Sequence, residues 1–547
     1  MKKHGLILLT LALGLSALFA SVAFADEPVM GGVLRWHEIN DPPKVDPAQV
    51  TDTTSSRVVY LMFDSLVEND ADGKGVTPAL AESWEGSDGG KVWTFHLRKG
   101  VHFHKETEGQ PTANGGREVK AADWKYSFER LVYENSPRAY FLDMVKGYQD
   151  FISRDETGAK EWAGIKVVDD YTLQFELEYP FAPFVAVLAY NTFVVVPKED
   201  AEKWGKEFNF HPVGTGPFCF DKWDHDQKLA TKRNPDYWRK DDAGRQLPYL
   251  DGVEIVVIPD PTITYEEYKK GNIDCYRDIP DEFYEDVQAN YKSVFQERPQ
   301  LGTYYYGFNN EMGDFAGPEK LKLRQAFNYA VDRARISDLV LNGRFPAARG
   351  VLPPGFPGYN ENLKGYEYNP EKAKELMKES GYPDGFEVEL LVNNNPRHRA
   401  VGEAIQAQVA ELGIKMSIKV LDWGVMLDLC DRGEVNLFRM GWVVDYADPD
   451  NFLYVLFHSS NKGAKGNYSR YSNPEFDKLV EQARVDTDYA KRMELYQKAE
   501  QILVDDAAWL FLFHYSNSLL YQPWVKNIHM PAFGDYTTPL YNVWVQK

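Results

Sequence analysis

Strand and helix patterns alternate through residues 386–440, and this order constrains the fold more than any other feature of the chain. Every second residue from Phe386 to Val392 is apolar, as in a half-buried strand. A helix pattern over 400–412 and strand patterns over 416–420 and 435–440 follow it. This order predicts an α/β fold with an at least partly parallel sheet. Because 547 residues exceed what one hydrophobic core supports, we expect two or three domains.

The last of these strands runs into a turn that carries a candidate site. Arg439 lies on the strand, Gly441 and Trp442 follow it, and Asp445-Tyr446 precede the turn residues 448–452. Ligands of open α/β folds bind at the carboxyl ends of strands, where this arginine, ring and carboxylate would meet. A structural alternative is that Asp445 caps the turn through its own backbone.

The run Gly441-Trp442, Asp445-Tyr446 and Asp448-Pro449-Asp450-Asn451-Phe452 resembles the extracytoplasmic solute-binding proteins of ABC importers, in the oligopeptide/dipeptide-binding family, family 5. Further runs that resemble this family occur in the expected order, including 231–238 and 268–274. In the family, an acidic residue three positions after the tryptophan receives the α-amino group of a bound peptide. The resemblance assigns that role to Asp445.

The resemblance implies the type II (cluster C) periplasmic-binding-protein fold, in which two lobes close on a hinge and an extra domain lies in the N-terminal half. We expect lobe I to comprise residues 26–72, 194–303 and 515–547, and lobe II residues 304–514. The extra domain, residues 73–193, is expected to pack on lobe I. The C-terminal segment is expected to return to lobe I.

The resemblance also implies further contacts to the ligand. Arg439 corresponds to an arginine that reaches a peptide carboxylate, and His398 lies near the position of a histidine used for longer peptides, a role that Arg397 or Arg399 could take instead. Glu38 and Ile39 are candidate contacts at the turn after the first strand. Three aromatic residues could line side-chain pockets, although core packing is the alternative for each: Trp442, Tyr446 and Trp36.

The function implied is capture of a di- or oligopeptide and its delivery to the membrane permease of an ABC importer. Members of the family also bind nickel chelates, haem, opines and oligosaccharides, so a non-peptide ligand stays open. A secreted hydrolase is a distant alternative, because the sequence has no Gly-x-Ser-x-Gly, His-Glu-x-x-His or Cys/His signature. We expect a monomer without enzymatic activity or cofactor.

The N-terminus has the pattern of a cleaved signal peptide. Lys2 and Lys3 precede an apolar run, and Ala23-Phe24-Ala25 forms an A-x-A cleavage site before Asp26. The leader contains no cysteine for lipid attachment, which favours a periplasmic protein. Cleavage after residue 25 removes two lysines and no acid, so the formal net charge changes from −21 to −23. Such an acidic chain is a poor candidate for binding nucleic acid.

The remaining reactive residues give no sign of a metal site. Cys219, Cys275 and Cys430 have no metal-like spacing, and three cysteines allow one disulfide or none. His102 and His104 would share a strand face, but no further ligand has suitable spacing.

Overall fold

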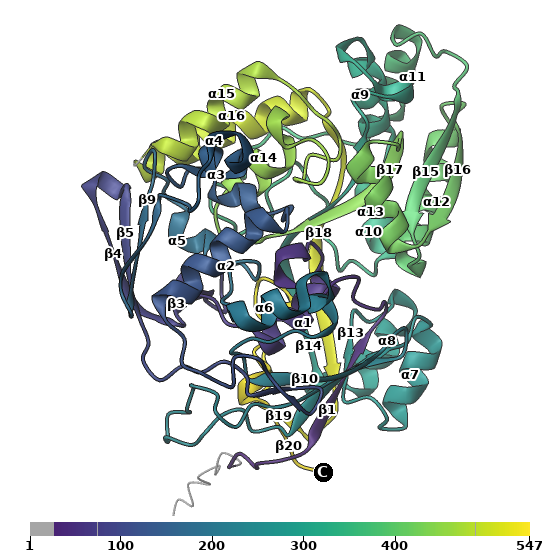
Figure 1. Cartoon of the computed structure of the whole chain (residues 1–547). Coiled ribbons are helices and arrows are strands. Elements are labelled where there is room, and N and C mark those ends of the chain that lie inside the picture. The colour runs from purple at the N-terminus through teal and green to yellow at the C-terminus, as the bar shows by residue number, and fades with distance from the viewer. Residues whose placement is uncertain (1–26, 74, 487) are drawn as a thin grey trace, which may run out of the picture.

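A ten-stranded mixed sheet spans both lobes in the computed structural model, which describes residues 27–73, 75–486 and 488–547 (Figure 1). The predicted leader, residues 1–25, lies outside these residues. The strand order is β10 (Phe218–Asp224), β11 (Lys228–Arg233), β12 (Gly252–Val257), β1 (Val33–Glu38), β13 (Cys275–Arg277), β18 (Trp509–Tyr521), β14 (Phe295–Phe308), β17 (Leu437–Val443), β15 (Glu387–Asn393) and β16 (Lys415–Leu421).

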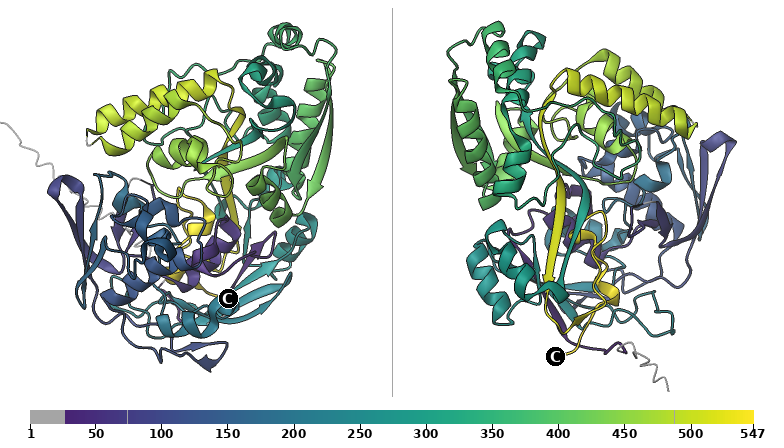
Figure 2. Two further views of the ribbon diagram at one scale, coloured as in Figure 1. Left: turned by 45° about the horizontal axis from the view of Figure 1, so that its top comes forward. Right: turned by 180° about the vertical axis from the view of Figure 1, so that it is seen from behind.

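Strands β14 and β18 form the centre of this sheet and connect its two ends (Figure 2). They pair antiparallel, and the pairing is irregular between Pro299 and Thr303. Proline supplies no N–H to a β-ladder, so an interruption beside Pro299 is expected. The lobe boundaries predicted at 303/304 and 514/515 fall beside this irregularity. Those boundaries remain a prediction, and two long strands with a local break are suited to act as the hinge.

Lobe I is built on the parallel pairs β1–β12 and β1–β13. Helices α7 (Pro261–Lys269) and α8 (Tyr284–Asn290) lie beside β13 (Figure 1). Buried residues of β1, such as Leu34 and Trp36, share one core with Val525, Ile528 and Val543. The C-terminal segment therefore packs against β1.

Lobe II contains the predicted parallel arrangement, since β15 pairs in parallel with both β16 and β17. Strand β17 is longer than predicted and includes Gly441, Trp442 and Val443, because its pairing with β14 continues as far as Gly302–Val443. The helices of this lobe are α9 (Leu321–Ala330), α10 (Arg333–Val340), α11 (Pro370–Glu379), α12 (Pro396–Ala410), α13 (Trp423–Arg432), α14 (Asp450–Phe457), α15 (Pro474–Val485) and α16 (Tyr489–Asp505).

The extra domain contacts both lobes. It contains helix α2 (Ala121–Tyr133) and a four-stranded sheet, in the order β4 (Ala81–Ser87), β5 (Val92–Leu97), β9 (Thr172–Glu176) and β8 (Ile165–Asp169). Toward lobe I, a ring nitrogen of His104 bonds the Gly216 carbonyl at 3.0 Å. Toward lobe II, Phe141 packs edge-on against Tyr446 with ring centroids 5.7 Å apart. An ion pair between Asp143 and Arg484 of α15, at 3.6 Å, also joins the extra domain to lobe II. This contact with lobe II was not predicted from sequence, and Figure 2 shows the extra domain beside α15 and α16.

Cys219, Cys275 and Cys430 are buried free thiols. Among the described residues, no helix is both long and apolar enough to cross a bilayer. The same residues contain no cluster of metal-ligating side chains, and His104 is used in the contact with Gly216.

Candidate functional site

A cavity of about 250 Å³ lies between the two lobes, and the extra domain contributes to its wall. Lobe I supplies Ile39 and the start of helix α1 (Thr53–Met62), while the extra domain supplies Arg138 and Tyr190. Lobe II supplies most of the predicted site residues, namely Arg397, His398, Arg439, Trp442 and Asp445. A cavity with walls from both lobes is one that opens and closes with the hinge.

Asn451 holds Asp445 and Trp442 in place. Its side-chain oxygen accepts hydrogen bonds from Trp442 Nε1 at 3.0 Å and from the Asp445 N–H at 2.9 Å. Its amide nitrogen donates to Asp445 Oδ2 at 3.1 Å. Asp445 is 9% exposed, and burial raises its pKa to about 6, although Arg138 and Asn451 both oppose the rise. The Asp445 carboxylate thus accepts a hydrogen bond from the Asn451 side chain. This differs from the structural alternative, in which Asp445 caps the turn through its own backbone.

Helices α15 and α16 anchor the turn before α14 and the start of α14, which carries Asn451. Arg492 of α16 donates to both carboxylate oxygens of Asp448 at 2.9 Å. Arg484 of α15 forms an ion pair with Asp450 at 3.0 Å. These buried acids therefore have a structural use, and Asp445 is the acid of this turn that lines the cavity.

Arg439 is a buried cation without an acidic partner among the described residues. It is 7% exposed and donates to Asn393 Oδ1 at 3.2 Å and to the Tyr515 hydroxyl at 2.8 Å. Its guanidinium lies 4.6 Å from the centroid of the Tyr304 ring, and its Nε has no hydrogen-bond partner. A Cβ at Gly441 would lie 1.8 Å from the Tyr515 hydroxyl, so a larger residue there would displace the tyrosine that accepts from Arg439. A buried arginine whose partners are all neutral is suited to pair with an anion.

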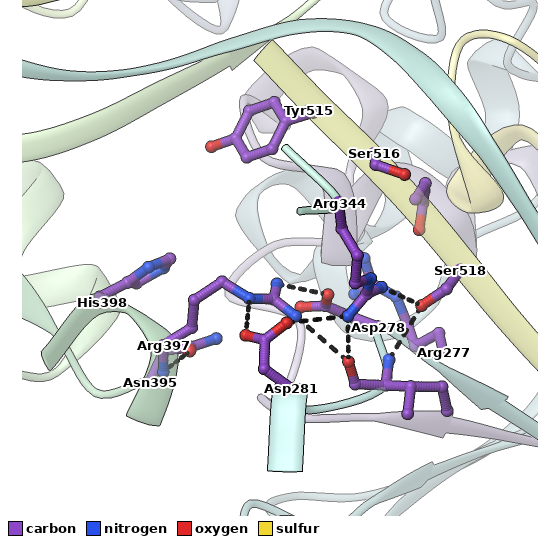
Figure 3. Close-up of polar contacts among 12 residues, drawn as sticks. Arg277, Asp278, Asp281, Arg344, Asn395, Arg397, His398, Tyr515, Ser516 and Ser518 are labelled. Carbon is purple, nitrogen blue, oxygen red and sulfur yellow. Dashed lines mark hydrogen bonds and ion pairs between the residues drawn. The ribbon is translucent and has the colours of Figure 1, made fainter. Parts of the chain in front are cut away.

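Arg397, at the start of α12, forms ion pairs across the gap between the lobes (Figure 3). Its Nη1 donates to Asp278 Oδ1 at 2.6 Å and its Nε to Asp281 Oδ2 at 3.0 Å, both on lobe I. Its Nη2 donates to the Ile279 carbonyl at 3.2 Å. Burial raises the pKa of Asp278, but Arg397 and Arg277 outweigh it and hold the value at about 2. Arg344 of lobe II also reaches Asp281, at 3.0 Å.

His398 follows Arg397 on the same helical turn and is neutral at pH 7. Burial and the charges of Arg439 and Arg397 lower its pKa well below the usual value. Its Nδ1 lies 3.3 Å from the Tyr304 hydroxyl. Arg399, the other candidate for this role, has a side chain 67% exposed and pairs with Glu403 on its own helix.

Three residues predicted from sequence do not line the cavity. Glu38 is buried between two arginines, with Arg57 at 2.6 Å and Arg277 at 2.8 Å. The Tyr446 hydroxyl donates to Asp450 at 2.7 Å, and its ring packs inside the core. Trp36 is buried beneath the Arg57 guanidinium. We therefore leave these three out of the proposed contact set.

Several wall residues were missed by the sequence analysis because nothing local marks them. They come from segments far apart in the chain: Arg138, Tyr190, Tyr304, Asn393, Asn517 and Tyr515. Asn451 lies inside the turn already singled out, but its role as a clamp depends on how the turn folds back on Trp442.

Strand β17 presents one unpaired edge to the cavity. Its pairing with β15 ends at Phe438, whereas its pairing with β14 continues to Val443. Residues 439–443 all line the cavity, and within the described part of the chain no strand pairs with their second edge. Backbone N–H and C=O groups of such an edge can bond an extended chain.

Two lobes joined by a two-strand hinge, with a charged cavity between them, define a binding protein that closes around its ligand. Comparison with known proteins agrees with this class. The model for bacterial extracellular solute-binding proteins, family 5, matches residues 75–464. The chain belongs to this family.

Relatives cover nearly the whole chain. A dipeptide-binding protein of Escherichia coli (strain K12) is 32% identical over 544 residues, covering 96% of each chain. Heme-binding protein A of Haemophilus influenzae is 34% identical over 506 residues, covering 90% of this chain and 89% of the relative. The structure of the periplasmic binding protein DppA from Helicobacter pylori in complex with the peptide STSA matches with a TM-score of 0.82 and 31% identity, over 95% of this chain and 99% of that one.

An Arg397→Gln variant is expected to open more readily. The lost pairs with Asp278 and Asp281 are partly solvated, so the closed form should lose about 1 kcal/mol, close to a fivefold shift toward open. Small-angle scattering of the ligand-free protein should show a larger mean radius of gyration. Arg399→Gln is the matched control, since that side chain pairs within its own helix. Identical scattering from the two variants would contradict the role of Arg397 in closure.

Proposed function

We propose that this protein is the periplasmic peptide-binding component of an ABC importer, which encloses a short peptide between its lobes and delivers it to the membrane permease. One observation carries the proposal: the cavity wall contains a buried carboxylate, Asp445, and a separate buried arginine, Arg439, that has no acidic partner in the described chain. A zwitterionic peptide loses water from both charged ends when it is enclosed, and each end then needs an opposite charge. Asp445 would receive the ammonium and Arg439 the carboxylate.

The unpaired edge of β17 supports a peptide rather than a compact solute. Main-chain bonds to residues 439–443 do not depend on the ligand's side chains, so they allow peptides of varied sequence. Arg397 is a weaker candidate for the terminal carboxylate than Arg439, because its Nε and both Nη atoms already donate to lobe I acceptors.

We infer binding without catalysis, in keeping with the solute-binding family to which the chain belongs. The predicted signal peptide and the periplasmic relatives support a location in the periplasm. A monomer suffices for the proposed function, because one chain supplies the whole cavity wall.

A non-peptide solute is the second candidate, because a relative of similar identity is named a heme-binding protein. Native mass spectrometry of the purified protein separates the two. We expect a ladder of short peptides to be released on denaturation. Release of a single species without an ammonium group would overturn the peptide proposal while leaving the fold and family unchanged.

Peptide binding is expected to weaken as the pH falls through about 6. Burial raises the pKa of Asp445 to that value, so below pH 6 the free protein holds the acid in its neutral form, and affinity should fall by up to about tenfold per pH unit. Isothermal titration calorimetry between pH 8 and pH 5 measures this. Burial also raises the pKa of Asp448 to about 6, so both acids titrate in this pH range. The Asp445→Asn variant separates their effects, because its weaker residual affinity should not fall between pH 8 and pH 5.

A further inference from the structure

Arg138 is a second buried cation on the cavity wall, and it comes from the extra domain. It is 1% exposed. Its guanidinium carbon lies 5.4 Å from the centroid of the Trp442 ring, so it lies at the same end of the cavity as the clamp formed by Trp442, Asp445 and Asn451. The Tyr190 hydroxyl lies beside it. Arg138 therefore faces the place that the proposed function assigns to the ligand's ammonium group.

The contacts of Arg138 leave its charge incompletely matched. Its Nη1 donates to the Ala464 carbonyl at 3.2 Å, and its Nε has no hydrogen-bond partner. Among the described residues, no carboxylate forms an ion pair with it. The charge of Arg138 lowers the pKa of two acids at longer range, Asp445 and Asp431. In both acids the effect of burial is larger, so the pKa is raised to about 6. A buried cation without direct pairing is costly, so the site gains if an anion enters.

The other acids on the wall do not provide this anion. Asp278 already pairs with Arg397 at 2.6 Å. Asp52 lines the cavity, but its carboxylate caps α1 by accepting the Ser55 N–H.

A zwitterionic peptide satisfies only part of this site. Under the proposed function, the carboxylate terminus of the peptide pairs with Arg439 and its ammonium pairs with Asp445. Arg138 is then left without a direct ionic partner. In a peptide that begins with aspartate or glutamate, the side-chain carboxylate lies a few bonds from the ammonium. That geometry brings an anion to the end of the cavity where Arg138 lies.

We propose that the site selects peptides whose first residue is acidic, with the ammonium on Asp445, the first side-chain carboxylate on Arg138 and the terminal carboxylate on Arg439. The inference rests on the proposed function and adds a substrate preference to it. Arg138 is then a specificity-determining residue supplied by the extra domain, and the planar guanidinium suits a carboxylate better than an ammonium side chain does.

The test uses four tripeptides of equal length and isothermal titration calorimetry on the full mature protein. Glu-Ala-Ala is compared with Gln-Ala-Ala, with Lys-Ala-Ala and with its isomer Ala-Glu-Ala, which has the same composition and net charge. We expect Glu-Ala-Ala to bind about 10- to 100-fold more tightly than Gln-Ala-Ala, the range for a hydrogen bond to a charged group. Ala-Glu-Ala should gain little, because its acid lies one residue farther from Asp445.

Two variants locate the effect. In Arg138→Gln the preference for Glu-Ala-Ala over Gln-Ala-Ala should disappear, and in Arg138→Lys it should be reduced but present. Equal affinities for the four peptides in the wild-type protein would overturn the inference, and this result does not depend on whether a variant folds. An equal loss for all four peptides in Arg138→Gln would also overturn it, since Arg138 would then serve the main chain or the fold. Absence of binding by any peptide would instead contradict the proposed function.

Discussion

An Asp445→Asn variant is expected to bind free-amino peptides about 100-fold more weakly than the wild-type protein, because removing one partner of a buried ion pair leaves the other charge uncompensated. Asparagine has nearly the same shape. It can still accept from the Asn451 side chain, and its backbone bond to Asn451 is unaffected, so the melting temperature should change little. Calorimetry with one tripeptide in free and N-acetylated forms measures the effect.

The acetylated peptide makes this experiment specific. In the wild-type protein, acetylation should weaken binding strongly, whereas Asp445→Asn should bind the two forms with similar affinity. Asp431→Asn is the matched control, since Asp431 is another partly buried acid of lobe II that feels the charge of Arg138 but does not line the cavity. It should keep an affinity close to wild type. Unchanged affinity in Asp445→Asn would remove this residue from the binding site.

An Arg57→Met variant is expected to destabilise lobe I by about 3–5 kcal/mol, the usual effect of leaving buried acids without their partner. Arg57 is 1% exposed and lies between Glu38 and Asp535, with its Nε 2.6 Å from Glu38 and its Nη1 donating to the Asp535 carbonyl at 3.0 Å. Arg277 would then face both acids alone. Urea denaturation measures the loss in the free energy of unfolding. Hydrogen exchange of the β1 amides shows whether the loss lies in lobe I.

A double variant tests whether charge is the cause. Adding Glu38→Gln to Arg57→Met removes one stranded acid and should recover part of the lost stability, so the two effects should not be additive. Arg432→Ala is the surface control, because its pairs with Asp428 and Glu434 are exposed and should not change stability measurably. Additive losses in the double variant would show that Arg57 acts through packing on Trp36 instead.

The site residues that lie within one continuous segment of the chain could be predicted from sequence. The order of strands and helices through residues 386–440 predicted parallel pairing, which β15, β16 and β17 confirm. The residue types after the last of these strands pointed to Asp445 and Arg439, and both line the cavity. Their predicted roles toward a ligand remain to be tested by the variants above.

The part of the site that depends on tertiary contacts was not predictable. Glu38 lies next to a cavity residue, Ile39, but faces Arg57, and its direction depends on how α1 packs against β1. Arg138 lies about three hundred residues before Asp445, and only the docking of the extra domain brings them to one cavity. The acids that hold Arg397 lie on the opposite lobe, so its local sequence gave no sign that its donors were used.

The return of the C-terminal segment to lobe I also decides when that lobe can finish folding during synthesis. Arg57 and its partner Asp535 are separated by 478 residues, and the apolar core around Leu34 needs Val525 and Val543. Because ribosomes add about 5–20 residues per second, the first strand waits roughly half a minute to a minute and a half for these partners. Lobe II, whose predicted range of residues 304–514 is continuous, can complete its core first. The core of the first lobe thus stays unfinished until residues 525–543 have been made.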